Sequence, residues 1–343
     1  MAFSAIYTTM YEWDHHRNCW RYKDKVPDLA DKSPKDVNPY QFADVFKMTY
    51  ECFIVLVDWL VEKPNEDQSW DTPWSRWLHA CQSTSMSPET AVVCLVLHLF
   101  TQGTCDRNAF MLGVPASTYL LMADIITLEL AMRVSEVIQF SPKKDQVCMR
   151  SNETKQPMPG ALFAMDRTLC RLPHRGKYNE FVSRKSQPQI NVLIVCDWNK
   201  NLVYVEPEFT GRTQDNDMFN NSVLHEEMKL PDFPPKEGGY ILVDEGFACN
   251  VHVIRPYSKK RDEPDILFFN KVFKSTRMIV ENAIGARKKK CPLLSTGMHD
   301  LVSEDLTVTI LASTVLYQFY KTTNEVLERV DASVYERGGV HPT

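Results

Sequence analysis

The chain has 343 residues, of which 44% are hydrophobic and 11% aromatic, so it can bury the cores of two ordinary domains. This composition excludes a globally disordered protein. The formal net charge of -5 excludes a protein that wraps nucleic acid with its whole surface.

Membrane-spanning, secreted and disulfide-bonded classes also lose support. No apolar run approaches the length of a membrane span, and residues 1–22 carry Glu12, Asp14 and Arg17 where a signal peptide needs an apolar stretch. The ten cysteines are scattered and form no C-x-x-C pair, which disfavours a disulfide framework and a zinc knuckle. We expect a soluble, intracellular protein with reduced, mostly buried thiols.

The N-terminal part is interpreted as an arm, residues 1–40, followed by a helical domain, residues 41–140. Residues 41–62 place apolar side chains at three- and four-residue intervals, which predicts one buried amphipathic helix. Trp70, Trp74 and Trp77 follow at near-helical spacing and are expected in the core rather than in a base-stacking platform.

Three further helices are predicted between residues 86 and 140. Ser87 is the expected N-cap of a helix ending near residue 101, and a short helix follows over 105–112. The third, capped by Ser117, is expected over 118–138, and the glycine-containing turn before it completes a helix-turn-helix pattern. Because Thr118–Met132 contains no Lys or Arg, we favour a structural or dimer-forming role for it over base reading.

The second half alternates strands and helices after a polar linker, residues 141–159, and before a short tail, residues 331–343. Two consecutive hairpin strands, then a helix, a strand and a helix, predict an α/β mixed sheet in a domain over residues 160–330. The expected strands are 162–166, 190–197, 202–209, 240–243 and 251–254, and the expected helices are 215–228, 273–287 and 304–329. The sequence contains no glycine-rich motif that could bind the phosphates of a nucleotide, which disfavours a dinucleotide-binding protein and an NTPase.

Three acids occupy matching places in this half. Asp166 and Asp244 each end an apolar strand, and Glu281 lies inside a helix one turn after Arg277. Hard cations such as Mg²⁺ take carboxylate oxygens as ligands. The pattern therefore predicts that the three acids converge on one metal site, with Arg277 orienting Glu281.

Other polar residues of this half receive different roles. Asp215 is expected to cap the helix that follows it, with support of the metal as the lesser alternative, and Asp197 is expected to shape a hairpin. Glu245 is not expected to be a ligand, because it should point away from Asp244. The segment 255–290 has eleven Lys or Arg against four Asp or Glu, a local net charge of +7 that suits a polyanionic substrate.

Taken in order, these motifs resemble the DDE transposases of the PIF/Harbinger superfamily, from about Phe42 to Phe319. The resemblance is carried by residues 163–173, 178–197 and 209–222, by the turn Asp244–Phe247, and by Arg255–Tyr257, Asn270, Arg277, Glu281 and Gly285. It implies a ribonuclease-H-like catalytic domain with Asp, Asp and Glu in this order. The chain departs from the family's usual residues at Phe163, Arg167, Leu169 and Gln214.

The resemblance implies metal-assisted cleavage of DNA followed by strand transfer. Two Mg²⁺ or Mn²⁺ ions about 4 Å apart would clamp the attacking and leaving oxygens. Asp166 would bridge the ions, with Asp244 on one and Glu281 on the other. Phosphate contacts are then expected from Lys271, Lys274, Lys288, Lys289 and Lys290, although Arg287–Lys290 equally suits the negative end of a helix dipole.

The same resemblance implies a nuclear protein, cytoplasmic until its import is assisted, that works with a Myb/SANT-like DNA-binding partner and can form a homodimer. The outer face of the helical domain, including Trp70–Trp77, is the expected docking surface. Two alternatives stay open: a host-domesticated chromatin or adaptor protein that keeps the fold without catalysis, and a ribonuclease-H-like nuclease without strand transfer.

Overall fold

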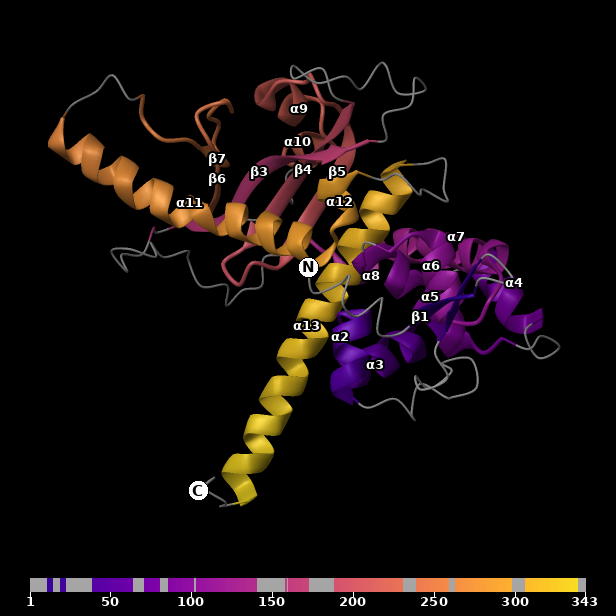
Figure 1. Cartoon of the computed structure of the whole chain (residues 1–343). Coiled ribbons are helices and arrows are strands. Elements are labelled where there is room, and N and C mark those ends of the chain that lie inside the picture. Colours follow the sequence, from indigo (N-terminus) through magenta and orange to yellow (C-terminus); the bar gives the residue numbers. More distant parts are fainter. Residues whose placement is uncertain are drawn as a thin grey trace.

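A five-stranded mixed sheet forms the centre of the second half of the protein in the computed structural model (Figure 1). Its order is β5-β4-β3-β6-β7. The first three strands in sequence form an antiparallel meander, and β6 and β7 then add in parallel to the free side of β3. The strands are β3 (Ala161–Arg171), β4 (Gln189–Asp197), β5 (Leu202–Thr210), β6 (Tyr240–Leu242) and β7 (Val253–Ile254). The predicted α/β mixed sheet of ribonuclease-H-like type is confirmed.

The structure describes residues 11–14, 19–22, 39–63, 71–80, 86–101, 103–140, 158, 160–172, 188–230, 239–258, 263–297 and 306–338. Within the predicted arm, β1 (Tyr11–Asp14) and β2 (Cys19–Tyr22) pair as an antiparallel hairpin. Trp70, most of the predicted linker and residues 339–343 of the predicted tail lie outside the described residues. The rest of the predicted tail, residues 331–338, is instead the end of the long helix α13 (Leu306–Gly338).

Both faces of the sheet are covered, because successive strand residues point to opposite sides. Phe163, Met165 and their counterparts on β4 and β6 pack under α9 (Asp215–Asn220) and α10 (Val223–Glu227). Ala164 and Leu242 face the other way, toward α11 (Pro264–Lys290), α12 (Leu293–Thr296) and α13 (Leu306–Gly338). The expected single helix over 215–228 is therefore two short ones; Ser222 starts the second by accepting a bond from the His225 amide at 3.1 Å.

One hydrophobic core joins the helical part to the sheet. It runs from Phe42 of α2 through the helices of the first half to β3, β4, α11 and α13. The long helix α13 packs against α7, α3 and α8 as well as against β5, and in Figure 1 it passes between the two halves. The helices of the first half are α2 (Pro39–Phe46), α3 (Tyr50–Val61), α4 (Pro73–Ala80), α5 (Pro88–Phe100), α6 (Cys105–Met111), α7 (Ala116–Met132) and α8 (Val134–Val137).

The single helix expected over residues 41–62 is broken. Lys47 adopts a positive φ of 56°, and the Thr49 hydroxyl then accepts a hydrogen bond from the Cys52 amide at 3.3 Å, which starts α3. A left-handed residue ends one helix and a hydroxyl cap begins the next. The apolar spacing continues across the break, so periodicity alone could not reveal it.

The cap expected from Ser87 is confirmed, since its hydroxyl accepts a bond from the Thr90 amide at 3.3 Å. The cap expected from Ser117 is wrong: α7 begins at Ala116 after Pro115 and has no side-chain cap. Helices α6 and α7 meet at 101°, within the range of a helix-turn-helix. Half of α7 is buried, and its main neighbours are α13 and α5, which agrees with a structural role.

Trp74 is fully buried and donates from Nε1 to the Leu60 carbonyl oxygen at 2.8 Å, while Trp77 stacks on it at 5.1 Å. Trp74 is a core residue as expected and cannot contribute to a docking surface, whereas Trp77 is partly buried and packs against the core. Seven of the cysteines in the described part of the chain are free thiols, and five of these seven are buried. No single helix among the described residues is long and apolar enough to cross a membrane, and only the bent pair α6–α7 reaches that length and apolarity together.

Candidate active site

Asp166 lies in the middle of β3, and Asp244 lies two residues beyond the end of β6, the strand parallel to it. Ala164 of β3 pairs with Leu242 of β6, so a further step of two residues brings Asp166 beside Asp244. The same period of two places both acids on the face that Ala164 and Leu242 present to α11. The sheet register therefore brings together two of the three acids that the sequence singled out.

Burial dominates the environment of Asp166. Desolvation raises the pKa of its carboxyl group, and the nearby negative charge of Asp244 raises it further. Three interactions oppose this shift: the charge of Arg277, a hydrogen bond from the Arg167 amide at 2.8 Å, and one from Arg277 Nη1 at 2.9 Å. Burial thus disfavours the charged form of this carboxyl group, whereas the hydrogen-bond donors around it favour that form.

Arg277 connects Asp166 to the third acid. While Nη1 donates to Asp166 Oδ2, Nη2 donates to Glu281 Oε1 at 2.5 Å, one turn along α11. The side chain of Glu281 is 49% exposed, whereas that of Arg277 is 14% exposed. The expected pairing of Arg277 with Glu281 is confirmed, and Arg277 also links α11 to the sheet.

A second arginine ties a fourth acid to the site. Arg167 Nε forms an ion pair with Asp215 Oδ1, and Arg167 Nη1 donates to Asn191 Oδ1 at 3.4 Å. Asp215 is the first residue of α9, after Gln214, and its side chain does not cap that helix. The capping role expected for Asp215 is therefore wrong, because its carboxylate turns toward β3 and away from the free amides of its own helix.

Gly246 lies between the carboxylates of Asp215 and Asp244. Its amide donates to Asp244 Oδ1 at 2.5 Å. A Cβ atom at this position would clash with the Asp215 carboxylate and lie 3.0 Å from Asp244 Oδ1. The close approach of two acids to this backbone therefore requires glycine.

Sequence reasoning identified Arg167 only as a departure from a family pattern, and it missed the contact with Asp215. A cation in the middle of an apolar strand, next to an acid that ends an apolar run, was the available signal.

Asp197 has the expected hairpin role, since it accepts from the amide and side chain of Asn201 at 2.8 and 2.9 Å.

The described residues contain no group of three His, Cys, Asp or Glu side chains close enough to hold a metal ion. Asp166 and Glu281 are joined through the Arg277 guanidinium instead. The donor chemistry nevertheless suits a hard cation, since all four acids offer carboxylate oxygen. Convergence of the three acids on a metal remains a prediction.

The five lysines expected at phosphates divide into two groups. Lys271, Lys274 and Lys289 of α11 are exposed. Lys288 donates from Nζ to the Leu169 carbonyl oxygen at 2.8 Å, and Lys290 contacts the Lys47 carbonyl oxygen and lies 3.4 Å from the centre of the Tyr320 ring. The ammonium groups of Lys288 and Lys290 therefore bind the protein itself, contrary to the phosphate contacts expected for them.

A family model described as "DDE superfamily endonuclease" matches residues 168–318. The HARBI1 protein of Rattus norvegicus is 24% identical over 245 residues, which cover 69% of this chain and 68% of that protein. For HARBI1 of Homo sapiens the identity is 23% over 243 residues with the same coverage, and for that of Xenopus laevis it is 24% over 206 residues, 58% of this chain and 57% of the relative. No solved structure matches the chain.

Proposed function

From the premise that this chain carries a Harbinger-type DDE endonuclease domain, we propose that it is a metal-dependent DNA endonuclease with strand-transfer activity. The observation that supports this proposal best is the register of β3 and β6, which sets Asp166 beside Asp244 on the face covered by α11. Glu281 is linked to Asp166 through the Arg277 guanidinium. One acid in the middle of β3, one that follows the end of β6 and one on the covering helix form a donor set made of oxygen alone.

We propose Asp166, Asp244 and Glu281 as the residues that would hold Mg²⁺ or Mn²⁺. When bound, the cations would supply charge stabilisation at the attacking and leaving oxygens of a phosphodiester. Asp244 is oriented by the Gly246 amide, and Asp166 by the Arg167 amide. These backbone donors fix two carboxylates in advance, which limits the reorganisation that ligand binding would otherwise cost.

The exposed cations of α11 support the choice of a polyanionic substrate. Lys271 and Lys274 lie in the turns before Arg277, and Lys289 lies two turns after Glu281. Side chains of this kind neutralise phosphates and position a duplex without reading its sequence. We propose these three residues as the phosphate contacts, in a nuclear protein assisted by a separate DNA-binding partner with a Myb/SANT-like domain.

The experiment is a cleavage assay on duplexes that carry the sequences flanking the protein's own gene, with and without Mg²⁺ or Mn²⁺. We expect metal-dependent cleavage by the unmodified protein and none by Asp244→Asn, because the amide keeps the volume but removes the charge that holds a cation. Asp265→Asn, at an exposed acid in the first turn of α11, is the matched control and should cleave normally.

Two outcomes would contradict the proposal. Cleavage by a correctly folded Asp244→Asn protein at the normal rate would remove the assignment of the site. Absence of cleavage by the unmodified protein with either metal would favour the alternative of a non-catalytic adaptor that keeps the fold.

A further inference from the structure

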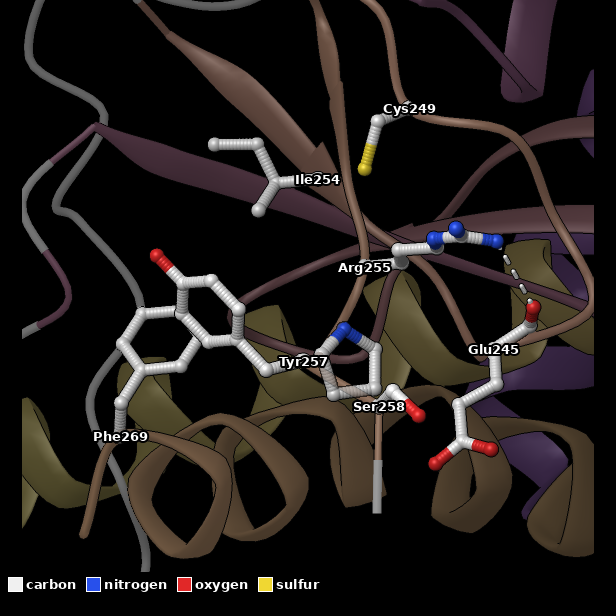
Figure 2. Close-up of a pocket in the computed structure, with 8 residues that line it drawn as sticks. Glu245, Cys249, Ile254, Arg255, Tyr257, Ser258 and Phe269 are labelled. Atoms are coloured by element: carbon white, nitrogen blue, oxygen red, sulfur yellow. Dashed lines mark hydrogen bonds between the residues drawn. The ribbon is translucent and has the colours of Figure 1, made fainter. Parts of the chain in front are cut away.

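A cavity of about 560 Å³ lies beside the candidate active site, between the turn that follows β6 and the first turns of α11 (Figure 2). Its volume is in the range of sites that take a small organic group. One wall is aromatic, formed by Tyr257 and Phe269, and the opposite wall carries Arg255 and Glu245. Neither wall contributes a residue of the proposed metal-binding set.

The aromatic wall is fixed in place. Tyr257 and Phe269 meet edge to face, with ring centroids 5.3 Å apart, and Phe269 packs in turn on Phe273 at 5.7 Å. The Asn270 side chain holds the backbone of Tyr257 at both its polar groups, accepting from its amide at 2.9 Å and donating to its carbonyl oxygen at 3.1 Å. Tyr257 is nevertheless 47% exposed, so a rigid aromatic ring is presented to solvent.

The polar wall connects this cavity to the catalytic acids. Arg255 Nη1 donates to the carbonyl oxygens of Glu245 and Phe247 at 3.3 and 3.2 Å, and the first of these bonds is drawn in Figure 2. The amide of Gly246, in the middle of the same turn, donates to Asp244. A group in the cavity and a group on Asp244 would therefore lie on the two sides of one four-residue turn.

We infer that this cavity receives an unpaired nucleobase of the DNA strand beside the cleaved phosphate, an inference that rests on the proposed function. A base offers a flat aromatic face and an edge of donors and acceptors, which the cavity matches with the Tyr257 ring on one side and with Arg255 and Glu245 on the other. Stacking on a preformed aromatic side chain is the usual way in which proteins hold an unstacked base. The position one turn away from Asp244 would keep a strand end in place during its reaction.

The test measures binding without cleavage, so that it does not depend on nuclease activity. Asp244→Asn protein is titrated, without metal, into duplexes ending in an unpaired 2-aminopurine, whose fluorescence falls when it stacks. We expect fluorescence quenching, and we expect Tyr257→Leu in the same background to abolish it and to weaken binding about 10-fold, the loss of one stacked base. Phe268→Leu, at an exposed phenylalanine of the same helix outside the cavity, should leave both signals unchanged.

A fully paired duplex and free 2-aminopurine nucleotide complete the design. The paired duplex should show no difference between Tyr257→Leu and its parent, and the free nucleotide should bind far more weakly than the tailed duplex. Equal quenching by the parent and Tyr257→Leu, or no quenching at all, would overturn the cavity assignment. Because cleavage is measured separately, a protein that cleaves but shows no quenching refutes only this inference, and one that quenches without cleaving refutes only the nuclease proposal.

Discussion

One side chain, that of Arg277, provides most of the stabilisation that offsets the cost of burying the Asp166 carboxylate. Burial raises its pKa, and among the groups that oppose this, the charge of Arg277 is the largest. Arg277 also neutralises Glu281, and both contacts use the same guanidinium. Arg277 is therefore a positioning residue whose effect can be measured in the absence of any substrate.

Arg277→Gln should destabilise the metal-free protein. The substitution leaves a buried carboxylate without its charged donor, a loss worth roughly 1–3 kcal/mol in the free energy of unfolding. Urea denaturation in the presence of a chelator measures it, and added Mn²⁺ should restore part of the loss if the three acids bind the ion. Lys274→Gln, one turn earlier and exposed, is the control; equal midpoints for the two variants would contradict the role of Arg277.

Lys290 should make the free energy of unfolding vary with pH in the alkaline range. Burial lowers its pKa from 10.5 to about 8. Above pH 10.5 the amine is neutral in both states and the penalty is absent; as the pH falls toward 8 the unfolded state takes up the proton first, so stability declines. As the pH falls from 10 to 8, the free energy of unfolding should therefore decrease less steeply for Lys290→Met than for the parent. The difference in slope should correspond to the uptake of up to about one proton.

Exposed Lys289, replaced by Met, is the control for that experiment. Its pH dependence should match that of the parent. If Lys290→Met also matches the parent, the contacts of Lys290 with Tyr320 and the Lys47 carbonyl oxygen compensate fully for its burial.

At the scale of elements, the C-terminal half of α11 carries an anomaly in its packing. Arg287 is fully buried between β3 and α13, near Cys170, Cys291 and Tyr317, and burial lowers its pKa. None of the three guanidinium nitrogens has a hydrogen-bond partner among the described residues. Because burying an unpaired charge costs free energy, we expect Arg287 to lower the stability of the folded protein.

Arg287→Leu should therefore stabilise the protein. Replacing a buried charged side chain by an apolar one of similar volume is neutral or favourable by about 1–4 kcal/mol, which differential scanning calorimetry would record as a higher Tm. Lys289→Leu, at an exposed position two residues along, should change the Tm little. A lower Tm for Arg287→Leu would show that the arginine's own contacts outweigh its desolvation.

For the whole molecule, the charge distribution argues for weak DNA binding by this chain alone. The net charge is -5, α7 carries no basic side chain in Thr118–Met132 and is half buried, and Lys288 and Lys290 are bound internally. Duplex affinity comes largely from phosphate neutralisation, and two of the five lysines expected to provide it bind the protein itself. Among the described residues, the helices of the first half and the sheet share one hydrophobic core.

Fluorescence anisotropy at physiological salt should therefore give a Kd of about 1 μM or weaker, with little sequence preference. Replacing the three exposed lysines, Lys271, Lys274 and Lys289, by Gln should weaken this binding and reduce its salt dependence, whereas Lys288→Gln should not. Nanomolar, sequence-selective binding by the chain alone would show that a DNA-binding partner is unnecessary.

The sequence by itself determined the strands of the second half, the Ser87 cap and the Arg277–Glu281 pair, because each depends on residues close together in the chain. The expectation that Asp166 ends its strand is wrong, since β3 continues to Arg171. Only the tertiary structure decided the break at Lys47, the turn of Asp215 toward Arg167, the burial of Arg287 and the inward contacts of Lys288 and Lys290. Each of these depends on what lies opposite a residue across the sheet or between helices. Local pattern shows which face a side chain occupies, but the partner that neutralises, desolvates or displaces it comes from a distant part of the chain.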